Sequence, residues 1–216
     1  MVVFKTEVAK RVIKYYSERC ASLLSRNTNR GSIIMVARAL GRHGIAFDIV
    51  KSYCDDAVER LAKAKKLDEK GVFTIVKQGD AREMDLRDER VDLILTSPPF
   101  WDLEPYESVE GQLADIETYP SFLKELGKTI SECFRVLKKD KFCAFVVNDF
   151  RKGGHFYDFH NDVIKLSRKA GFLLWDIIIN VLHSPMVSGV AQREKVRQTV
   201  KIHEYILILK KGEEDI

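Results

Sequence analysis

The chain has 216 residues, of which 45% are hydrophobic and 31% are charged, and its formal net charge is +4 at pH 7. These values exclude a disordered tail, a collagen-like chain and a disulfide scaffold, and they favour one compact domain. No apolar run approaches the ~20 residues of a membrane span, and the start of the chain does not resemble a secretory signal. The pI near 8.8 permits a polyanionic partner without requiring one.

Four cysteines lie far apart, with no C-x-x-C pair among them: Cys20, Cys54, Cys133 and Cys143. This spacing predicts reduced intracellular thiols and neither a zinc site nor a disulfide framework. We therefore expect a cytoplasmic protein with no metal site and no membrane partner.

Apolar runs and amphipathic stretches alternate along the chain. Helical spacing of apolar residues predicts helices over residues 5–17, 32–40, 52–67, 119–137 and 160–170. Apolar runs between turn residues predict strands over residues 21–25, 44–50, 72–77, 91–96, 142–147, 172–182 and 203–209. Such alternation is typical of a mostly parallel sheet with helices on both faces. Because no clear helix separates the last two strands, one of them is expected to run antiparallel at the edge.

Ligands of open parallel sheets bind beyond the carboxyl ends of the strands. Three places in the sequence meet this rule, namely residues 25–31, Asp48 and residues 97–100. We expect a binding site where these three strand ends meet.

The segment Ser97-Pro-Pro-Phe100 directly follows the buried strand 91–96. Two consecutive prolines remove two backbone donors and fix two φ angles, so carbonyl oxygens can face a pocket. Ser97 Oγ and the Pro98 carbonyl can accept hydrogen bonds from an exocyclic amine and orient its lone pair, while Phe100 can stack on a base. A strand-terminating turn with a buried Phe100 and Trp101 is the alternative, and the tetrapeptide alone does not decide between the two.

With its neighbours, this tetrapeptide resembles the signature of the amino-group DNA methyltransferases, which modify N4 of cytosine or N6 of adenine. Residues 106–112, 145–149 and 203–210 are similar to further segments of that family, so the resemblance covers nearly the whole chain. It implies a Rossmann-like, S-adenosylmethionine-dependent methyltransferase fold with a seven-stranded, mostly parallel sheet and one antiparallel strand in the edge region. It also implies a single domain over residues 1–216. The implied catalytic residues are Ser97, Pro98, Pro99 and Phe100.

The same resemblance implies where S-adenosylmethionine binds. The implied cofactor-binding residues are Lys5, Thr6, Ser25, Asn29, Gly31, Asp48, Gly79, Asp80 and Ala81. In the family, the acid at the position of Asp48 binds ribose hydroxyls, a polar residue at the position of Asp80 contacts the adenine amine, and Lys5 and Thr6 adjoin the methionine end. Ordinary roles stay open: Asp48 near a helix start, Asp80 in a Gly-Asp turn, and Thr6 as a helix cap.

The end of the first strand departs from the family pattern Asp-Pro-Phe-x-Gly-x-Gly-Thr. Of that pattern, residues 25–32 keep only Gly31 and the hydroxyl that follows it, and Ser25 replaces a carboxylate. Glycines let the backbone approach a cofactor at positive φ, and Asn29 tolerates that geometry better than most residues. Two arginines in the same segment are bulky enough to fill the space of the methionine group. The pattern leaves open whether the cofactor binds normally, weakly or not at all.

The resemblance implies direct methyl transfer to a flipped base without a covalent intermediate. Ser97 favours N4 of cytosine over N6 of adenine, and related RNA or protein-glutamine methyltransferases usually carry Asn at this place. The implied DNA contacts are Trp101, Arg151, Lys152, Arg193, Lys195 and Arg197. Such charge runs are equally common on solvated surfaces. Gly153-Gly154 predicts a flexible loop that could close over a base. Asp149 is either a second polar group near the pocket or a surface acid, and the surface role is favoured.

We therefore expect a DNA methyltransferase of the kind found in restriction-modification systems. The alternative is a catalytically impaired, nucleic-acid-binding paralogue or a partner subunit, and a homodimer also stays open. Because 216 residues leave no room for a separate target-recognition domain, specificity is expected from short loops or a partner subunit, or to be relaxed.

Overall fold

The computed structural model describes residues 6–26, 31–64, 71–103, 106–182 and 201–212. The helices are α1 (Thr6–Tyr16), α2 (Ser32–Ala39), α3 (Lys51–Lys63), the short 3-10 helix η3 (Leu113–Asp115), α4 (Tyr119–Val136) and α5 (Phe159–Lys169). The strands are β1 (Ser22–Arg26), β2 (His43–Asp48), β3 (Thr74–Gln78), β4 (Val91–Thr96), β5 (Leu137–Val147), β6 (Phe150–Lys152), β7 (His155–Tyr157), β8 (Leu173–Val181) and β9 (His203–Lys210).

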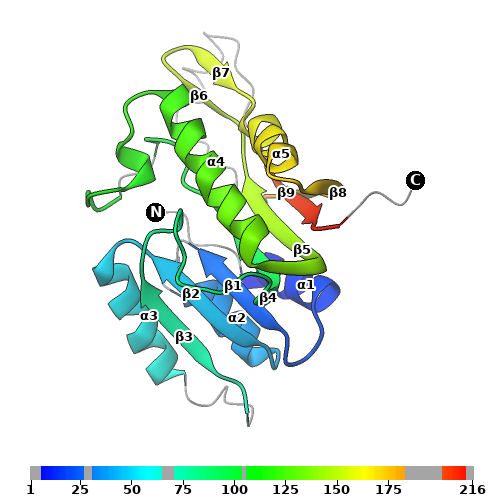
Figure 1. The fold of residues 1–216 in the computed structure, drawn as a ribbon. Helices are drawn as coiled ribbons and strands as arrows, with labels where there is room; N and C mark the ends of the chain where they lie inside the picture. The colour runs from blue at the N-terminus through cyan, green and yellow to red at the C-terminus, as the bar shows by residue number, and fades with distance from the viewer. Residues whose placement is uncertain (1–5, 27–30, 65–70, 104–105, 183–200, 213–216) are drawn as a thin grey trace.

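Seven strands form one sheet in the order β3-β2-β1-β4-β5-β9-β8, which confirms the predicted seven-stranded, mostly parallel arrangement (Figure 1). The antiparallel strand is β9, which pairs with both β5 and β8. The antiparallel strand lies in the edge region, as predicted, and β9 is second from the edge because β8 lies outside it.

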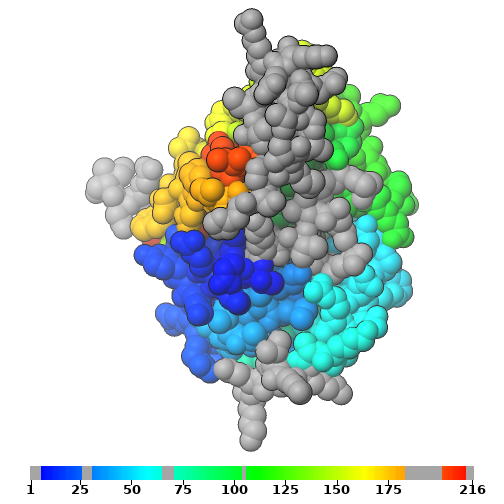
Figure 2. All heavy atoms as spheres, turned by 180° about the vertical axis from the view of Figure 1, so that it is seen from behind, coloured from blue at the N-terminus to red at the C-terminus, as the bar shows by residue number. Residues whose placement is uncertain are grey.

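Two hydrophobic cores cover the two faces of the sheet. One core joins β1, β4, β5 and β9 to α1 and α2, and it includes Leu61 of α3. The other joins the opposite faces of these strands to α4 and α5. Figure 1 shows α4 across the front of the sheet, and Figure 2 shows α1 and α3 at the surface from behind. The two-sided burial explains why β4 is apolar almost throughout, with Asp92 as its only residue that is not fully buried.

A two-stranded hairpin of β6 and β7 lies outside the main sheet. Lys152 pairs with His155 across Gly153 and Gly154, whose φ angles are 56° and 82°. Positive φ at both central residues is what a type I′ hairpin turn requires, and glycine adopts it readily. The flexible loop expected here is thus a regular hairpin, which the sequence reading missed because each strand is only three residues long.

Within the described part of the chain, no helix is both long and apolar enough to cross a membrane.

Candidate active site

A pocket opens at the carboxyl ends of β2, β3 and β4, the edge that the strand pattern predicted. It encloses about 520 Å³, its opening to solvent included. Its lining residues are Phe47, Asp48, Ile49, Asp80, Ala81, Thr96, Pro98, Pro99, Gly111, Gln112, Leu113, Leu126, Thr129 and Phe145. The structure thus brings together five residues that the sequence singled out from three separate strand ends: Asp48, Asp80, Ala81, Pro98 and Pro99.

Asp48 ends β2 and is only 7% exposed. Its Oδ1 accepts a hydrogen bond from the backbone N–H of Val50 at 3.0 Å, and Val50 is the N-cap residue of α3. Asp48 therefore supports the start of α3, as one of the two readings predicted, and it also lines the pocket. Its binding of ribose hydroxyls stays a prediction. The hydrogen bond from the Val50 N–H holds the Asp48 carboxylate in one orientation.

Asp80 is held by a network that the sequence reading missed. Its carboxylate bonds the Arg82 guanidinium at 2.5 Å and the Arg82 backbone N–H at 2.8 Å. Arg82 in turn donates to Glu125 of α4 at 2.7 Å and to the Gly111 carbonyl at 3.0 Å. The hydrogen bond to Asp80 is the main cause that raises the pKa of Arg82. The Gly-Asp turn is therefore real, and it also places Asp80 on the pocket wall.

Gly111 explains why the segment after the tetrapeptide reaches the pocket. It has a φ of 86°, and a Cβ there would lie 2.9 Å from Arg82 Nη2 and 3.1 Å from Ile49 Cδ1. Only glycine meets both demands without displacement of a neighbour. The close approach lets Gly111, Gln112 and Leu113 close one side of the pocket.

The tetrapeptide turns at the end of β4, as predicted. Pro98 and Pro99 are buried and form pocket wall, whereas Ser97 and Phe100 are half-buried beside it. The Phe100 ring meets Phe159 of α5 edge-on, with the ring centroids 5.9 Å apart. The prolines therefore join the pocket directly, and Ser97 and Phe100 flank it.

Trp101 does not lie where a DNA contact was expected. It is 7% exposed, and its indole N–H donates to the Ile116 carbonyl at 2.7 Å. Its ring packs near Tyr119 and Tyr157 at centroid distances of 5.5 and 5.8 Å. This placement speaks against contact with DNA, because the indole donor is occupied and the side chain belongs to the core.

The first strand ends beside the pocket without lining it. Ser25 is 1% exposed, and its Oγ is buried with no hydrogen-bond partner among the described residues. Gly31 is the N-cap of α2 at a φ of 76°, and a Cβ there would lie 3.1 Å from Ala57 Cβ. Gly79 adjoins the Phe47 ring of the pocket wall, and Thr6 is an exposed residue at the start of α1. The predicted residues Lys5, Asn29, Arg193, Lys195 and Arg197 lie outside the described residues.

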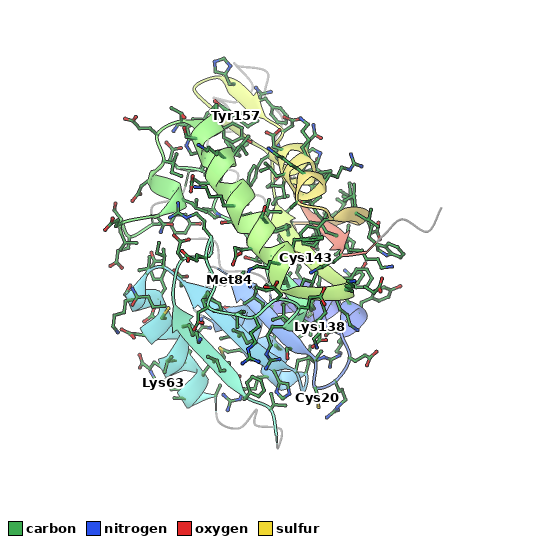
Figure 3. The ribbon with its side chains drawn as sticks, in the orientation of Figure 1. Cys20, Lys63, Met84, Lys138, Cys143 and Tyr157 are labelled. Carbon is green, nitrogen blue, oxygen red and sulfur yellow. The ribbon has the colours of Figure 1, made fainter. Side chains whose placement is uncertain are left out.

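Arg151 and Lys152, the two hairpin cations that were predicted to contact DNA, lie on opposite sides of the hairpin. Lys152 forms an ion pair with Asp102 and lies 4.2 Å from the centroid of the Trp101 ring. Arg151 is exposed on the other side and lies over Phe156. Tyr157, labelled in Figure 3, marks the hairpin at the end of the molecule far from Cys20 and Lys63. The expectation for Lys152 is weakened, since its charge already has an acidic partner.

Asp149 is not the surface acid that the sequence suggested. It is 7% exposed, and its Oδ1 contacts His160 Nδ1 at 2.6 Å and accepts from the His160 backbone N–H at 3.2 Å. Lys201 Nζ lies 3.4 Å from its Oδ2, and Tyr205 stacks on the His160 ring at 4.2 Å. Asp149 therefore ties the end of β5 to the starts of α5 and β9. Its place directly after a buried strand was the signal available in the sequence.

The sheet order and the pocket at its carboxyl edge are those of the Rossmann-like fold that S-adenosylmethionine-dependent methyltransferases share. Among solved structures, a methyltransferase of this class from Methanosarcina mazei is 16% identical and has a TM-score of 0.66, with 94% of this chain and 98% of that chain covered. A proposed methyltransferase from Bacillus halodurans is 15% identical with a TM-score of 0.64, covering 96% of this chain and 100% of that chain. Both likenesses show the shared fold.

Within that class, residues 91–215 match the DNA methylase family of N6 and N4 methylases. The match covers more than half of the chain, so the chain belongs to this family. A proposed DNA modification methylase from Thermus thermophilus is 32% identical, with 62% of this chain and 51% of that chain covered and a TM-score of 0.47. A search of curated proteins gave no match.

The residues of the pocket fit S-adenosylmethionine, the cofactor of this family. Asp48 offers a buried carboxylate for hydroxyl groups, Asp80 is an acceptor for an amine, and Phe47 and Phe145 offer apolar walls for a flat base. The unpartnered Ser25 Oγ is a further acceptor beside the first strand end. Cys54 packs behind Asp48. Its thiol is a poor nucleophile, because burial raises the pKa to about 11.

Proposed function

We propose that this protein transfers a methyl group from S-adenosylmethionine to an exocyclic amine of a DNA base, with N4 of cytosine favoured over N6 of adenine. One observation carries the proposal: the two prolines of the tetrapeptide form the wall of the same pocket that holds Asp48 and Asp80. The tetrapeptide and the cofactor-type residues therefore share one site, although they lie on different strands.

In this proposal, the protein acts by position and by hydrogen-bond acceptors. S-adenosylmethionine supplies an electrophilic methyl group when it is bound. Ser97 Oγ and the Pro98 carbonyl accept hydrogen bonds from the two amine N–H groups, so that the nitrogen lone pair points into the pocket. Both acceptors stabilise the positive charge that develops on the nitrogen, and neither forms a covalent bond to the substrate. Phe100 stacks on the flipped base. Transfer leaves the cofactor as the neutral thioether, and the methylated amine releases one proton to solvent.

Transfer of labelled methyl groups to DNA tests the proposal. The purified protein is incubated with labelled cofactor and with duplex or single-stranded DNA, and the DNA is digested to nucleosides. We expect label in N4-methylcytosine. Label in N6-methyladenine would reverse the choice of base, label in added RNA or protein would change the substrate class, and no label in any acceptor would refute the activity.

A catalytically impaired partner subunit is the second candidate. It is supported by the end of β1, where Ser25 stands in place of the carboxylate that the family carries. Titration calorimetry with S-adenosylmethionine separates the two candidates, because micromolar binding favours the enzyme and no binding favours the partner subunit.

A further inference from the structure

The β6–β7 hairpin has two faces with different surroundings. Cross-strand partners share a face, and faces alternate along each strand. Phe150 pairs with Tyr157 and Lys152 pairs with His155 on one face, while Arg151 pairs with Phe156 on the other. We call the first the inner face and the second the outer face.

The inner face attaches the hairpin to the tetrapeptide segment. The Phe150 and Tyr157 rings stack at 5.0 Å, and Tyr157 meets Tyr119 at 4.7 Å. Lys152 lies over the ring of Trp101, the residue directly after the tetrapeptide. The hairpin therefore has a firm aromatic base beside the segment that follows the tetrapeptide, on the side of the sheet where β4 ends and the pocket opens.

The outer face presents an exposed aromatic ring between cations. Phe156 is 48% exposed, the Arg151 guanidinium carbon lies 5.1 Å from its ring centroid, and Lys201 Nζ lies 4.5 Å from it. Lys201 is anchored by Asp149. Arg151 has no carboxylate within ion-pair distance in the part of the chain that the structure describes.

We propose that the outer face of the hairpin binds the nucleotide next to the target base, with Phe156 stacked on that base and Arg151 on its phosphate. This inference rests on the proposed function, because it takes DNA as the substrate. An aromatic ring beside an exposed guanidinium, here that of Arg151, is the arrangement by which proteins hold unpaired bases. A flat apolar protein partner would not need the cations, and a membrane surface would need more than one exposed ring.

The site also accounts for how the protein holds DNA around a flipped base. Flipping of one base leaves its neighbours partly unstacked, and a ring from the protein can replace the lost stacking. The type I′ turn and the aromatic base of the hairpin hold Phe156 in place before DNA binds. Little conformational entropy is then lost on binding.

Binding of DNA with a fluorescent base tests this site. The probe is a short oligonucleotide with 2-aminopurine next to a cytosine, measured with the full chain and with Phe156→Ala. Stacking on Phe156 should quench the probe, and Phe156→Ala should relieve the quench and weaken binding by about 5- to 100-fold. Arg151→Gln should weaken binding for all sequences and make the salt dependence less steep by about one unit of slope.

Two controls make the test specific. Phe73→Ala removes another exposed ring, 39% exposed and stacked on His43 away from the hairpin, and should leave DNA binding unchanged. Phe156→Leu keeps apolar contact with Lys201 but lacks an aromatic face, so it should behave like Phe156→Ala in the fluorescence assay. Thermal unfolding of each variant identifies any loss caused by misfolding.

The outcomes separate this inference from the proposed function. If the wild-type protein methylates DNA and Phe156→Ala binds the probe as tightly and quenches it as strongly, the inference is overturned and the function stands. If the wild-type protein binds and quenches the probe through Phe156 but methylates nothing, the nucleotide site stands and the proposed activity fails. If Phe156→Ala changes self-association but not DNA binding, the outer face is a protein interface and the inference is wrong.

Discussion

The two parts of the chain build the same pocket with different degrees of family likeness. Residues 91–215 match the DNA methylase family and contain the tetrapeptide. The part before them departs from the family pattern at the end of β1, and yet it places Asp48 and Asp80 in the same pocket. The difference teaches that the position of a strand end is set by the sheet, whereas the chemistry at that end is set by a few side chains.

The substitution Ser97→Ala should have the largest effect, and it tests the part that matches the family. Loss of one acceptor for the amine should lower the rate of methyl transfer by on the order of 100-fold or more, since single groups that stabilise developing charge have this weight. Cofactor affinity should hardly change, because Ser97 flanks the pocket without lining it. Single-turnover transfer and calorimetry measure the two quantities.

Ser131→Ala is the matched control, since Ser131 bonds a carbonyl within α4 on the surface. It should keep wild-type transfer. A Ser97→Ala protein that bound the cofactor much more weakly but kept its transfer rate at saturating cofactor would contradict the role assigned to Ser97.

The substitution Asp48→Asn tests the other part. The asparagine oxygen can still accept the Val50 N–H, so the start of α3 should be preserved while the charge that faces the pocket is lost. We expect cofactor binding to weaken about tenfold, as for a lost hydrogen bond to a charged group. Calorimetry with S-adenosylmethionine measures it, and Asp55→Asn, at an exposed ion pair with Lys51, is the control.

An Asp48→Asn protein with wild-type affinity would mean that Asp48 serves only the start of α3. The first part of the chain would then contribute shape but no specific contact to the cofactor, and the partner-subunit candidate would gain.

A comparison of two glycines tests the backbone at the altered strand end. Gly31 and Gly153 both have positive φ, but a Cβ at Gly31 would lie 3.1 Å from Ala57 Cβ, whereas a Cβ at Gly153 would meet nothing within 4 Å. Gly153→Ala should cost about 1 kcal/mol of unfolding free energy from φ alone. Gly31→Ala should cost about 1 kcal/mol more because of the contact.

Urea unfolding measures both glycine variants. Equal losses would show that α3 shifts easily at Ala57, and that the α2 start is less firmly held than the distance indicates. Ala57→Gly added to Gly31→Ala removes the contact but costs about 1 kcal/mol by itself inside α3. The double variant should therefore be less destabilised than the sum of the two single variants by the contact part of the loss.

The strand ends were predictable because they follow from periodicity and chain order. The buried run 91–96 and the acid at Asp48 fixed where chemistry could occur, and both lie at the pocket. The order of β8 and β9 was less certain, since a strand without a crossover helix can join either side of its predecessor. The order of β8 and β9 follows from the pairing of β9 with β5, a contact between residues far apart in sequence.

The side-chain partners were much less predictable. The charges of Asp149 and Lys152 pair with His160 and Asp102. Arg82, which binds the neighbouring Asp80, reaches Glu125 of α4. Trp101 was expected to contact DNA but belongs to the core, the alternative that the sequence left open, because a ring next to a turn can fold back as easily as it can face solvent. Whether such a side chain packs inward or faces solvent depends on tertiary contacts, which the periodicity of the sequence does not reveal.

The smallest expected effect concerns Cys54, which packs behind Asp48 in the first part of the site. Burial, and next the charge of Asp48, raise the pKa of its thiol to about 11, whereas an unfolded cysteine ionises near pH ~8.5. Above about pH 8.5 the unfolded chain therefore releases this proton while the folded chain keeps it. The contribution to unfolding free energy is complete below that pH and is lost as the pH rises toward 11.

Cys54→Ser has no thiol to ionise, so its unfolding free energy should fall less steeply from about pH 8 to about pH 10, by on the order of 1 kcal/mol. Urea unfolding at both pH values measures the slope, and Cys20→Ser, at an exposed thiol, should keep the wild-type slope. Equal slopes for the wild-type protein and Cys54→Ser would mean that the thiol ionises as easily in the folded protein as in the unfolded chain. The space behind Asp48 would then be open to water, and the carboxylate that we assign to the cofactor would be less firmly held than the corresponding wall at Pro98 and Pro99.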